Sequence, residues 1–268
     1  MWIPRLYAIL DASCFPDADA MHNAAEELVS AGCTLIQYRN KSGNARVMLE
    51  QAQELKRRYT VDRSLSWRHP EGPRLHERDE GSRAGRRRNQ SARDPSLRLK
   101  NGYARDDTGV NETRKIQTDA SPVRLIMNDR ADLCLAADFD GVHVGQDDLS
   151  PESVRRIIGW GTQGNARWLG VSTHNPEQVR EADQTSADYI ATGPVFATSS
   201  RENPDPVVGL EGVRRARELT RKPLVAIGGI TRANARSVID AGADSVAVIS
   251  DLLRDPGKSA EEFLRILG

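Results

Sequence analysis

The sequence predicts one α/β domain, a (β/α)8 TIM barrel formed by residues 1–268 and interrupted by a long polar insertion. Three observations lead there: eight short apolar runs recur along the chain, amphipathic stretches follow them, and one polar segment breaks the alternation. Short runs that are apolar throughout are typical of parallel strands covered on both faces. Eight strand–helix units in about 208 residues favour a closed barrel over the alternative, a doubly wound open sheet.

The expected strands come in order, and several of the helices between them have recognisable ends. Ser150 and Asn175 each precede a proline, the combination of an N-cap with proline at the first helical position. Gly242 stands where a left-handed C-cap would end a helix. An open sheet would leave two edge strands, and none of the runs has obviously polar edges. The strands are expected at residues 6–10, 35–39, 124–129, 141–145, 168–172, 189–194, 224–229 and 245–250.

Residues 61–120 form the insertion, between the second helix and the third strand. They hold eight large apolar residues, fourteen Lys or Arg and ten Asp or Glu, a net charge of +4, without helical or strand periodicity. Such a segment buries too little apolar surface to offset its ordering entropy, so we expect it to be disordered. The junction lies on the bottom face of a barrel, opposite the face that carries active sites.

The composition excludes several classes of protein. The chain has 38 Lys or Arg and 38 Asp or Glu, whereas a dedicated nucleic-acid binder usually has a basic excess. No apolar run is long enough to span a membrane, and the N-terminus does not resemble a signal peptide. Three widely spaced cysteines offer neither a disulfide framework nor a zinc site. We expect a cytoplasmic protein that binds small molecules, and we leave open whether it forms a homo-oligomer.

Polar residues and glycines follow the expected strands, at the end where barrels carry their active sites. Asp129 and Asp148 are hard oxygen ligands on neighbouring strands, which suits Mg²⁺ with its preference for one or two carboxylates plus phosphate oxygens. Arg39, Lys41 and Arg201 supply positive charge for phosphate groups. The candidate ligands of this face are Gln37, Arg39, Lys41, Asn128, Asp129, Asp148, Ser172, Thr198, Ser199, Ser200, Arg201, Gly229, Ile249 and Ser250.

Each of these features has a structural alternative. Asp129 with the following arginine can be a local ion pair, and Asp148 can cap a loop. Gly229 can serve a strand-to-helix turn alone. His143 lies within a strand and is expected to be a structural residue with satisfied hydrogen bonds. The functional interpretation is preferred because all the candidate ligands share one predicted face.

Seven motifs in chain order resemble thiamine-phosphate synthase. Each follows a predicted strand, and together they cover nearly all of the chain outside the insertion. The resemblance implies a transferase that joins 4-amino-2-methyl-5-(diphosphooxymethyl)pyrimidine to thiazole phosphate, giving thiamine phosphate and pyrophosphate with Mg²⁺ as cofactor. The motifs are QYRNK at residues 37–41, MNDRAD at 127–132, GVHVGQDD at 141–148, GVS at 170–172, GPVFATSS at 193–200, AIGGI at 226–230 and VIS at 248–250.

The resemblance also implies roles for individual residues. Asp129 and Asp148 would hold Mg²⁺, and Arg201, where the family usually has Lys, would help to hold the leaving pyrophosphate. The implied catalytic residues are Arg39, Lys41, Ser172 and Arg201. The implied contacts of the pyrimidine diphosphate are Gln37, Tyr38, Arg39, Asn40, Lys41, Asn128 and Ser172. The implied contacts of the thiazole phosphate are Thr198, Ser199, Ser200, Gly229, Ile249 and Ser250.

Two other functions fit a barrel with these motifs: a thiazole tautomerase-like enzyme and a non-catalytic protein that binds thiamine precursors. The pair of Asp129 and Asp148 favours the synthase, because a tautomerase needs no metal-bound pyrophosphate. No Cys–His or Ser–His signature for a protein nucleophile is evident, and the synthase reaction requires none.

Overall fold

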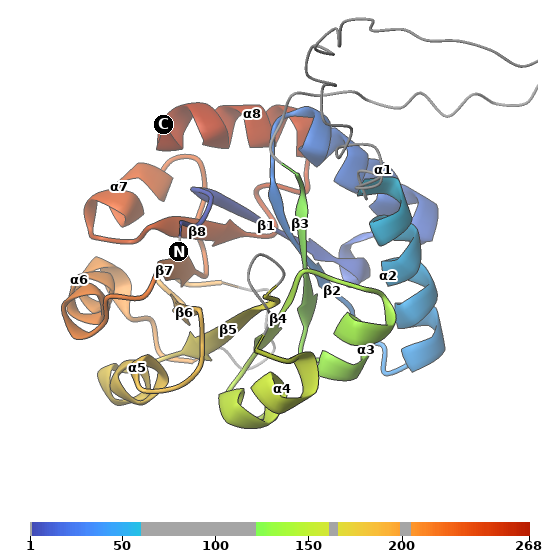
Figure 1. Cartoon of the computed structure of the whole chain (residues 1–268). Helices are drawn as coiled ribbons and strands as arrows, with labels where there is room; N and C mark the ends of the chain where they lie inside the picture. The colour runs from blue at the N-terminus through green and yellow to red at the C-terminus, as the bar shows by residue number, and fades with distance from the viewer. Residues whose placement is uncertain (1, 60–121, 161–165, 199–204) are drawn as a thin grey trace, which may run out of the picture. The chain divides into compact units, whose positions relative to one another are not determined.

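The computed structural model describes residues 2–59, 122–160, 166–198 and 205–268, and these form a closed barrel of parallel strands. The strands follow one another around the barrel in chain order, and β1 pairs with β8 to close it (Figure 1). The closed barrel confirms the predicted fold over the open sheet. Every strand lies within two residues of its predicted bounds: β1 (Leu6–Asp11), β2 (Leu35–Arg39), β3 (Arg124–Asn128), β4 (Gly141–Val144), β5 (Trp168–Thr173), β6 (Tyr189–Thr192), β7 (Leu224–Ile227) and β8 (Ser245–Val248).

Helices surround the barrel, and the predicted helix ends are present. The Ser150 and Asn175 side chains accept hydrogen bonds from the backbone of Ser153 and Gln178, at 3.3 and 2.9 Å. Gly242 has a φ of +111°, the left-handed backbone that favours glycine. Beside the short 3₁₀ segment η1 (Ala12–Cys14), the helices are α1 (Ala18–Ser30), α2 (Ala45–Tyr59), α3 (Ala131–Ala136), α4 (Pro151–Ile158), α5 (Pro176–Asp183), α6 (Gly209–Leu219), α7 (Ala235–Asp240) and α8 (Pro256–Leu267).

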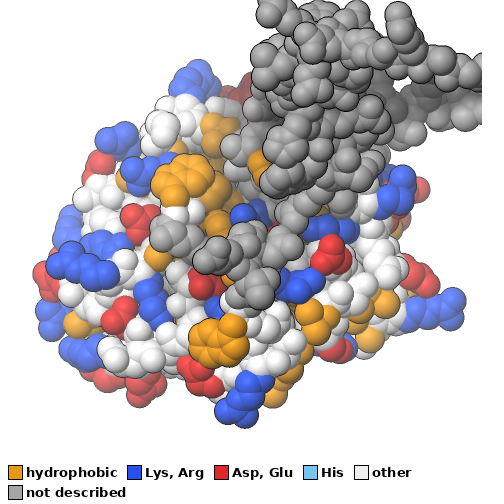
Figure 2. All heavy atoms as spheres, viewed as in Figure 1, with side chains coloured by type: hydrophobic (Ala, Val, Ile, Leu, Met, Phe, Trp, Pro, Cys, Tyr) orange, Lys and Arg blue, Asp and Glu red, His pale blue; other side chains and the backbone are white. Residues whose placement is uncertain are grey.

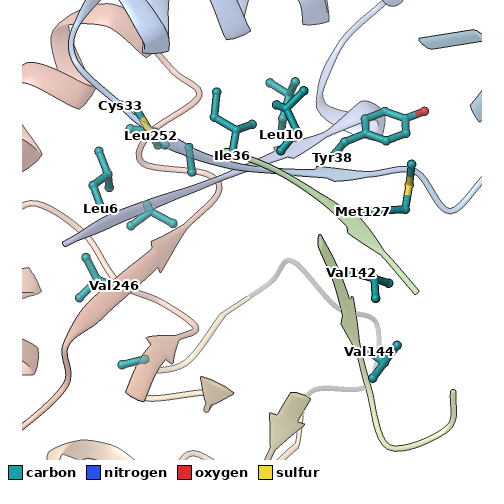
Figure 3. Close-up of a cluster of buried hydrophobic side chains, with 14 of the residues drawn as sticks. Leu6, Leu10, Cys33, Ile36, Tyr38, Met127, Val142, Val144, Val246 and Leu252 are labelled. Atoms are coloured by element: carbon teal, nitrogen blue, oxygen red, sulfur yellow. The ribbon is translucent and has the colours of Figure 1, made fainter. Parts of the chain in front are cut away.

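Successive side chains of each strand pack in two different layers. In β1, Leu6 and Leu10 pack outward against the helices, whereas Tyr7 and Ile9 fill the barrel interior. Figure 3 shows labelled side chains of the outer layer, from β1 to β4 and β8, on the helix side of the strands. Since both faces of every strand are covered, the apolar runs of the sequence needed no alternation of polar and apolar residues.

One device is repeated at the bottom of the barrel, where the strands begin. An aspartate just before a strand accepts a hydrogen bond from a backbone N–H of the preceding strand and forms an ion pair with a basic side chain of a helix. Each of these carboxylates therefore ties two strands and a helix together. The three sets are Asp140 with Leu125 and Lys56, Asp188 with Leu169 and Arg155, and Asp244 with Leu224 and Arg217.

The predicted insertion at residues 61–120 lies outside the described residues. Helix α2 ends before it at Tyr59, and β3 begins after it at Arg124. In the described part of the chain, no helix combines the length and the apolar character needed to cross a membrane. Acidic and basic side chains are interspersed over the face drawn in Figure 2, in keeping with the equal numbers of both in the sequence.

Candidate functional site

A cavity of about 570 Å³ opens at the C-terminal ends of the barrel strands, and all eight strands or the loops that follow them contribute to its lining. This is the face on which the sequence placed the candidate ligands, and most of them line it. Those that do are Gln37, Arg39, Lys41, Asn128, Asp129, Asp148, Ser172, Thr198, Gly229, Ile249 and Ser250.

The structure does not bring Tyr38 and Asn40 to the cavity. The Tyr38 hydroxyl donates to the Gln51 side chain of α2 at 2.6 Å, and the Asn40 amide donates to the same oxygen at 3.0 Å. Tyr38 lies on the outer side of β2 (Figure 3). Because residues of a strand alternate faces, Gln37 and Arg39 point inward and Tyr38 points outward, away from the cavity. Asn40 follows β2, and its side chain bonds α2 and is not part of the cavity lining. Three further candidates, Ser199, Ser200 and Arg201, lie outside the described residues.

Two carboxylates meet at the ends of β3 and the loop after β4. Asp129 has a left-handed backbone with φ +62°, and its N–H donates to the His143 carbonyl at 2.8 Å. The Asp148 carboxylate accepts from the Gly145 N–H at 2.7 Å. Burial raises the pKa of Asp148, and the neighbouring Asp129 carboxylate raises it further. Two carboxylates crowded in this way attract a cation.

This pair fits Mg²⁺, which is commonly held by one or two carboxylates and completes its coordination with phosphate and water oxygens. Across the described residues, no cluster of three or more His, Cys, Asp or Glu side chains offers a site built entirely from protein ligands. In this structure Lys41 supplies positive charge to the pair, with its Nζ 2.6 Å from Asp129 Oδ2.

Arg39, the other basic side chain at this end of the cavity, is held by Asp11, a carboxylate that the sequence analysis did not identify. Arg39 forms an ion pair with Asp11, the last residue of β1, which is 5% exposed. Asp11 in turn accepts hydrogen bonds from the Ser13 backbone N–H and hydroxyl, at 3.0 and 2.7 Å. The guanidinium is therefore fixed at the rim of the cavity. An aspartate ending the first apolar run was the signal available in the sequence.

The cavity floor carries a chain of hydrogen bonds that crosses the barrel. Gln37 Nε2 donates to the Tyr7 hydroxyl at 2.9 Å, and the Tyr7 and Tyr189 hydroxyls lie 2.9 Å apart. His143 Nδ1 lies 3.1 Å from the Tyr189 hydroxyl, and His143 Nε2 lies 2.9 Å from Ser172 Oγ. His143 has the satisfied hydrogen bonds that the sequence analysis expected. Tyr7 and Tyr189 were not foreseen, because nothing in an apolar run marks which residues face inward.

Glycines shape the opposite end of the cavity, after β7. Gly228 and Gly229 have φ values of +98° and +63°. A Cβ on Gly229 would lie 2.5 Å from the Ala197 carbonyl oxygen, so this close approach of two loops requires glycine. Together with Ile249 and Ser250 after β8, this loop forms the place where barrels commonly bind a phosphate group.

The geometry can thus accept two anionic groups in one cavity. Carboxylates and basic side chains lie at the ends of β2, β3 and β4, and a glycine loop with a serine lies after β7 and β8. Between them, the floor offers polar groups to a heterocycle. Such a site can hold two phosphorylated reactants side by side and stabilise a leaving anion.

Comparison with known proteins points to the same chemistry. A family model of thiamine monophosphate synthase matches residues 96–252. A thiamine-phosphate synthase of Koribacter versatilis is 47% identical over 268 residues, covering 99% of this chain and 96% of the relative. A second, from Chloroflexus aurantiacus, is 34% identical and covers 98% of this chain and 92% of the relative. The solved thiamine phosphate pyrophosphorylase of Pyrococcus furiosus is 28% identical, with a TM-score of 0.63 over 98% of this chain and 95% of that one.

Proposed function

The chain belongs to the thiamine-phosphate synthase family, and from this we propose that it joins an aminopyrimidine diphosphate to a thiazole phosphate, releasing pyrophosphate. The pyrimidine substrate is 4-amino-2-methyl-5-(diphosphooxymethyl)pyrimidine, and the product is thiamine phosphate. The observation that carries the proposal is that two carboxylates, Asp129 and Asp148, and two basic side chains, Lys41 and Arg39, line one end of a cavity whose other end is a glycine–serine loop.

The chemistry asks little of the protein beyond positioning and charge. The bond between the pyrimidine methylene and the diphosphate oxygen breaks, and its electron pair leaves with pyrophosphate. The amino-substituted ring delocalises the positive charge on the methylene, and the lone pair of the thiazole nitrogen then forms the new C–N bond. Arg39 and Lys41 stabilise the leaving anion. The floor and the phosphate loop hold the two rings within reach of each other.

Mg²⁺ is part of this proposal. Asp129 and Asp148 would hold it, and it would neutralise charge on the diphosphate as the bond breaks. Arg201 is expected to contact the leaving pyrophosphate, and Ser199 and Ser200 are expected to contact the thiazole phosphate. The Arg201 guanidinium would supply charge to the pyrophosphate in a planar fork, in contrast to the point charge of a lysine.

The test is pyrophosphate release from purified protein supplied with both precursors. The proposal expects release only when both precursors and Mg²⁺ are present, and a product identical to thiamine phosphate by mass. Release with the pyrimidine diphosphate alone would indicate a hydrolase instead. No release under any of these conditions, from a folded protein, would contradict the proposal.

The comparisons support the synthase over the two alternatives. The two relatives described above are named thiamine-phosphate synthases, and this chain covers 96% and 92% of their lengths. A thiazole tautomerase-like enzyme would not need the two crowded carboxylates, and a non-catalytic binding protein would not need charge aimed at a leaving group.

A further inference from the structure

The hydrogen-bond chain on the cavity floor joins two polar side chains of the cavity lining, Gln37 and Ser172, that do not bond each other directly. Gln37 and Ser172 line the cavity from β2 and β5, on different parts of the barrel wall. Between them run the Tyr7 and Tyr189 hydroxyls and the His143 ring, with every link between 2.9 and 3.1 Å. Tyr7 and Tyr189 are 1% and 0% exposed, so both hydroxyls are shielded from bulk solvent.

The middle members are two phenols and an imidazole, and their partners within the chain are the uncharged Gln37 and Ser172 side chains. Burial raises the pKa values of Tyr7 and Tyr189 above the ordinary value for a phenol. Each hydroxyl therefore has one hydrogen to donate, and the imidazole has one nitrogen that donates and one that accepts.

Two arrangements of the hydrogens satisfy the whole chain. In the first, Gln37 donates to Tyr7, Tyr7 to Tyr189, Tyr189 to the imidazole, and the imidazole to Ser172. Gln37 then presents an acceptor oxygen to the ligand, and the Ser172 hydroxyl presents a donor. In the second, every bond is reversed and the Gln37 amide is turned over, so the two ends exchange roles.

Two mixed arrangements of the inner bonds leave a fault in the interior. If Gln37 Oε1 accepts from Tyr7 while Ser172 accepts from the imidazole, the Tyr7 and Tyr189 oxygens face each other at 2.9 Å with no hydrogen between them. If Gln37 Nε2 donates to Tyr7 while Ser172 donates to the imidazole, one buried tyrosine hydroxyl has no acceptor. Either fault costs the free energy of an unsatisfied buried polar group.

We propose that Tyr7, Tyr189 and His143 are positioning residues that couple Gln37 to Ser172. The group that Gln37 turns toward Tyr7 then fixes whether Ser172 donates to the ligand, and the floor prefers heterocycles that offer one donor and one acceptor over those that offer two of a kind. The inference rests on the proposed function. An aminopyrimidine offers its amino group as a donor and a ring nitrogen as an acceptor, which matches the first arrangement. A 4-methoxy analogue offers two acceptors, so it has no donor for the Gln37 oxygen of the first arrangement.

The experiment measures dissociation constants by calorimetry for two probes, the monophosphates of 4-amino- and 4-methoxy-5-hydroxymethyl-2-methylpyrimidine. Neither carries a diphosphate leaving group, so binding is measured without turnover. The parent protein is compared with Tyr189→Phe, which cuts the chain and keeps the ring. The expected result is that the preference for the amino probe narrows by roughly tenfold in the variant, the size of one buried hydrogen-bond fault.

Tyr38→Phe is the matched control, since it removes an equally buried hydroxyl from the outer side of β2 and should leave the ratio unchanged. Tyr7→Phe cuts the chain one link earlier and replaces Tyr189→Phe should that variant not fold. An unchanged ratio in the folded variants, or the same narrowing in Tyr38→Phe, would overturn the inference and leave the proposed function standing. A parent that binds no amino probe would overturn the inference, and the pyrophosphate-release assay would still decide the proposed function separately.

Discussion

Carboxylates occur at both ends of the barrel, and the two ends treat them differently. At the bottom, Asp140, Asp188 and Asp244 each have a backbone N–H and a basic side chain as partners. At the top, Asp129 and Asp148 crowd each other, and the pKa of Asp148 is raised. Each bottom carboxylate has a backbone donor and a cation of its own, whereas the top pair divides one backbone N–H, on Asp148, and one lysine, on Asp129, between two adjacent carboxylates. Stability and function are thus divided between the ends of the same strands.

Removing a top carboxylate is the strongest test of this division. We expect Asp129→Asn and Asp148→Asn each to lower kcat by about a hundredfold or more. The two carboxylates would hold Mg²⁺, and its positive charge on the developing pyrophosphate would be worth several kcal/mol. The melting temperature should stay near that of the parent. Steady-state turnover at saturating substrates and limiting Mg²⁺, beside a thermal melt, checks both. If both variants turned over at the rate of the parent, Asp129 and Asp148 would not be the residues that hold Mg²⁺.

Between the two ends, His143 links the site to stability through pH. Burial lowers its pKa from 6.5 to about 4, so the folded state binds fewer protons than the unfolded state between these values. The parent should therefore lose stability as pH falls from about 6.5 to 4, by about 3 kcal/mol from this group. Urea unfolding across this range should show a shallower pH dependence for His143→Gln. Equal slopes would mean that the imidazole is not held neutral by the fold.

A bottom carboxylate should behave in the opposite way to the top pair. Asp188→Ala removes the partner of the Leu169 N–H and of the buried Arg155 guanidinium. We expect a loss of about 2 kcal/mol in the free energy of unfolding, with kcat unchanged in the protein that remains folded. Urea unfolding and active-site-normalised kinetics measure the two quantities. A large fall in kcat would show that the division between the ends is not real.

Adding a carboxylate at the top sharpens the comparison further. Ser250→Asp places a negative charge in the loop after β8, where the phosphate of the thiazole substrate is expected. Repulsion should raise the KM for the thiazole phosphate by roughly tenfold and leave the KM for the pyrimidine diphosphate little changed. Ser250→Ala controls for loss of the hydroxyl. Equal increases for both substrates would mean that the two ends of the cavity have been assigned the wrong way round.

The smallest effect is expected at the junction of α2 and β3, on the bottom face. Replacing residues 64–117 with a short Gly/Ser linker should leave kcat/KM within about tenfold of the parent, or roughly 1.4 kcal/mol. The junction lies opposite the cavity, and loop-closure entropy changes slowly with length. Melting and turnover of the deletion beside the parent provide the check. Failure to fold would make the segment an integral part of the barrel.

Patterns along the chain were enough to locate the strands and much of the site. Apolar runs predicted all eight strands within two residues, and proline after Ser150 and Asn175 marked two helix starts correctly. Asp129 and Asp148 could be paired in advance because parallel strands in a barrel end on one face. These are local signals, and in this chain local preference agrees with the final structure.

Other features depended on which way a side chain points. The motif at residues 37–41 suggested five neighbouring ligands, but the pleat turned Tyr38 outward, and its side chain and that of Asn40 bond Gln51 of α2. Conversely, Tyr7 and Tyr189 stand 182 residues apart in the chain and meet only when β1 and β6 face each other across the interior. The sequence by itself determined the alternation of strands and helices and the end at which polar residues gather. Closure of the barrel decided which of them touch, because contacts across its interior join strands with no sequence relation to one another.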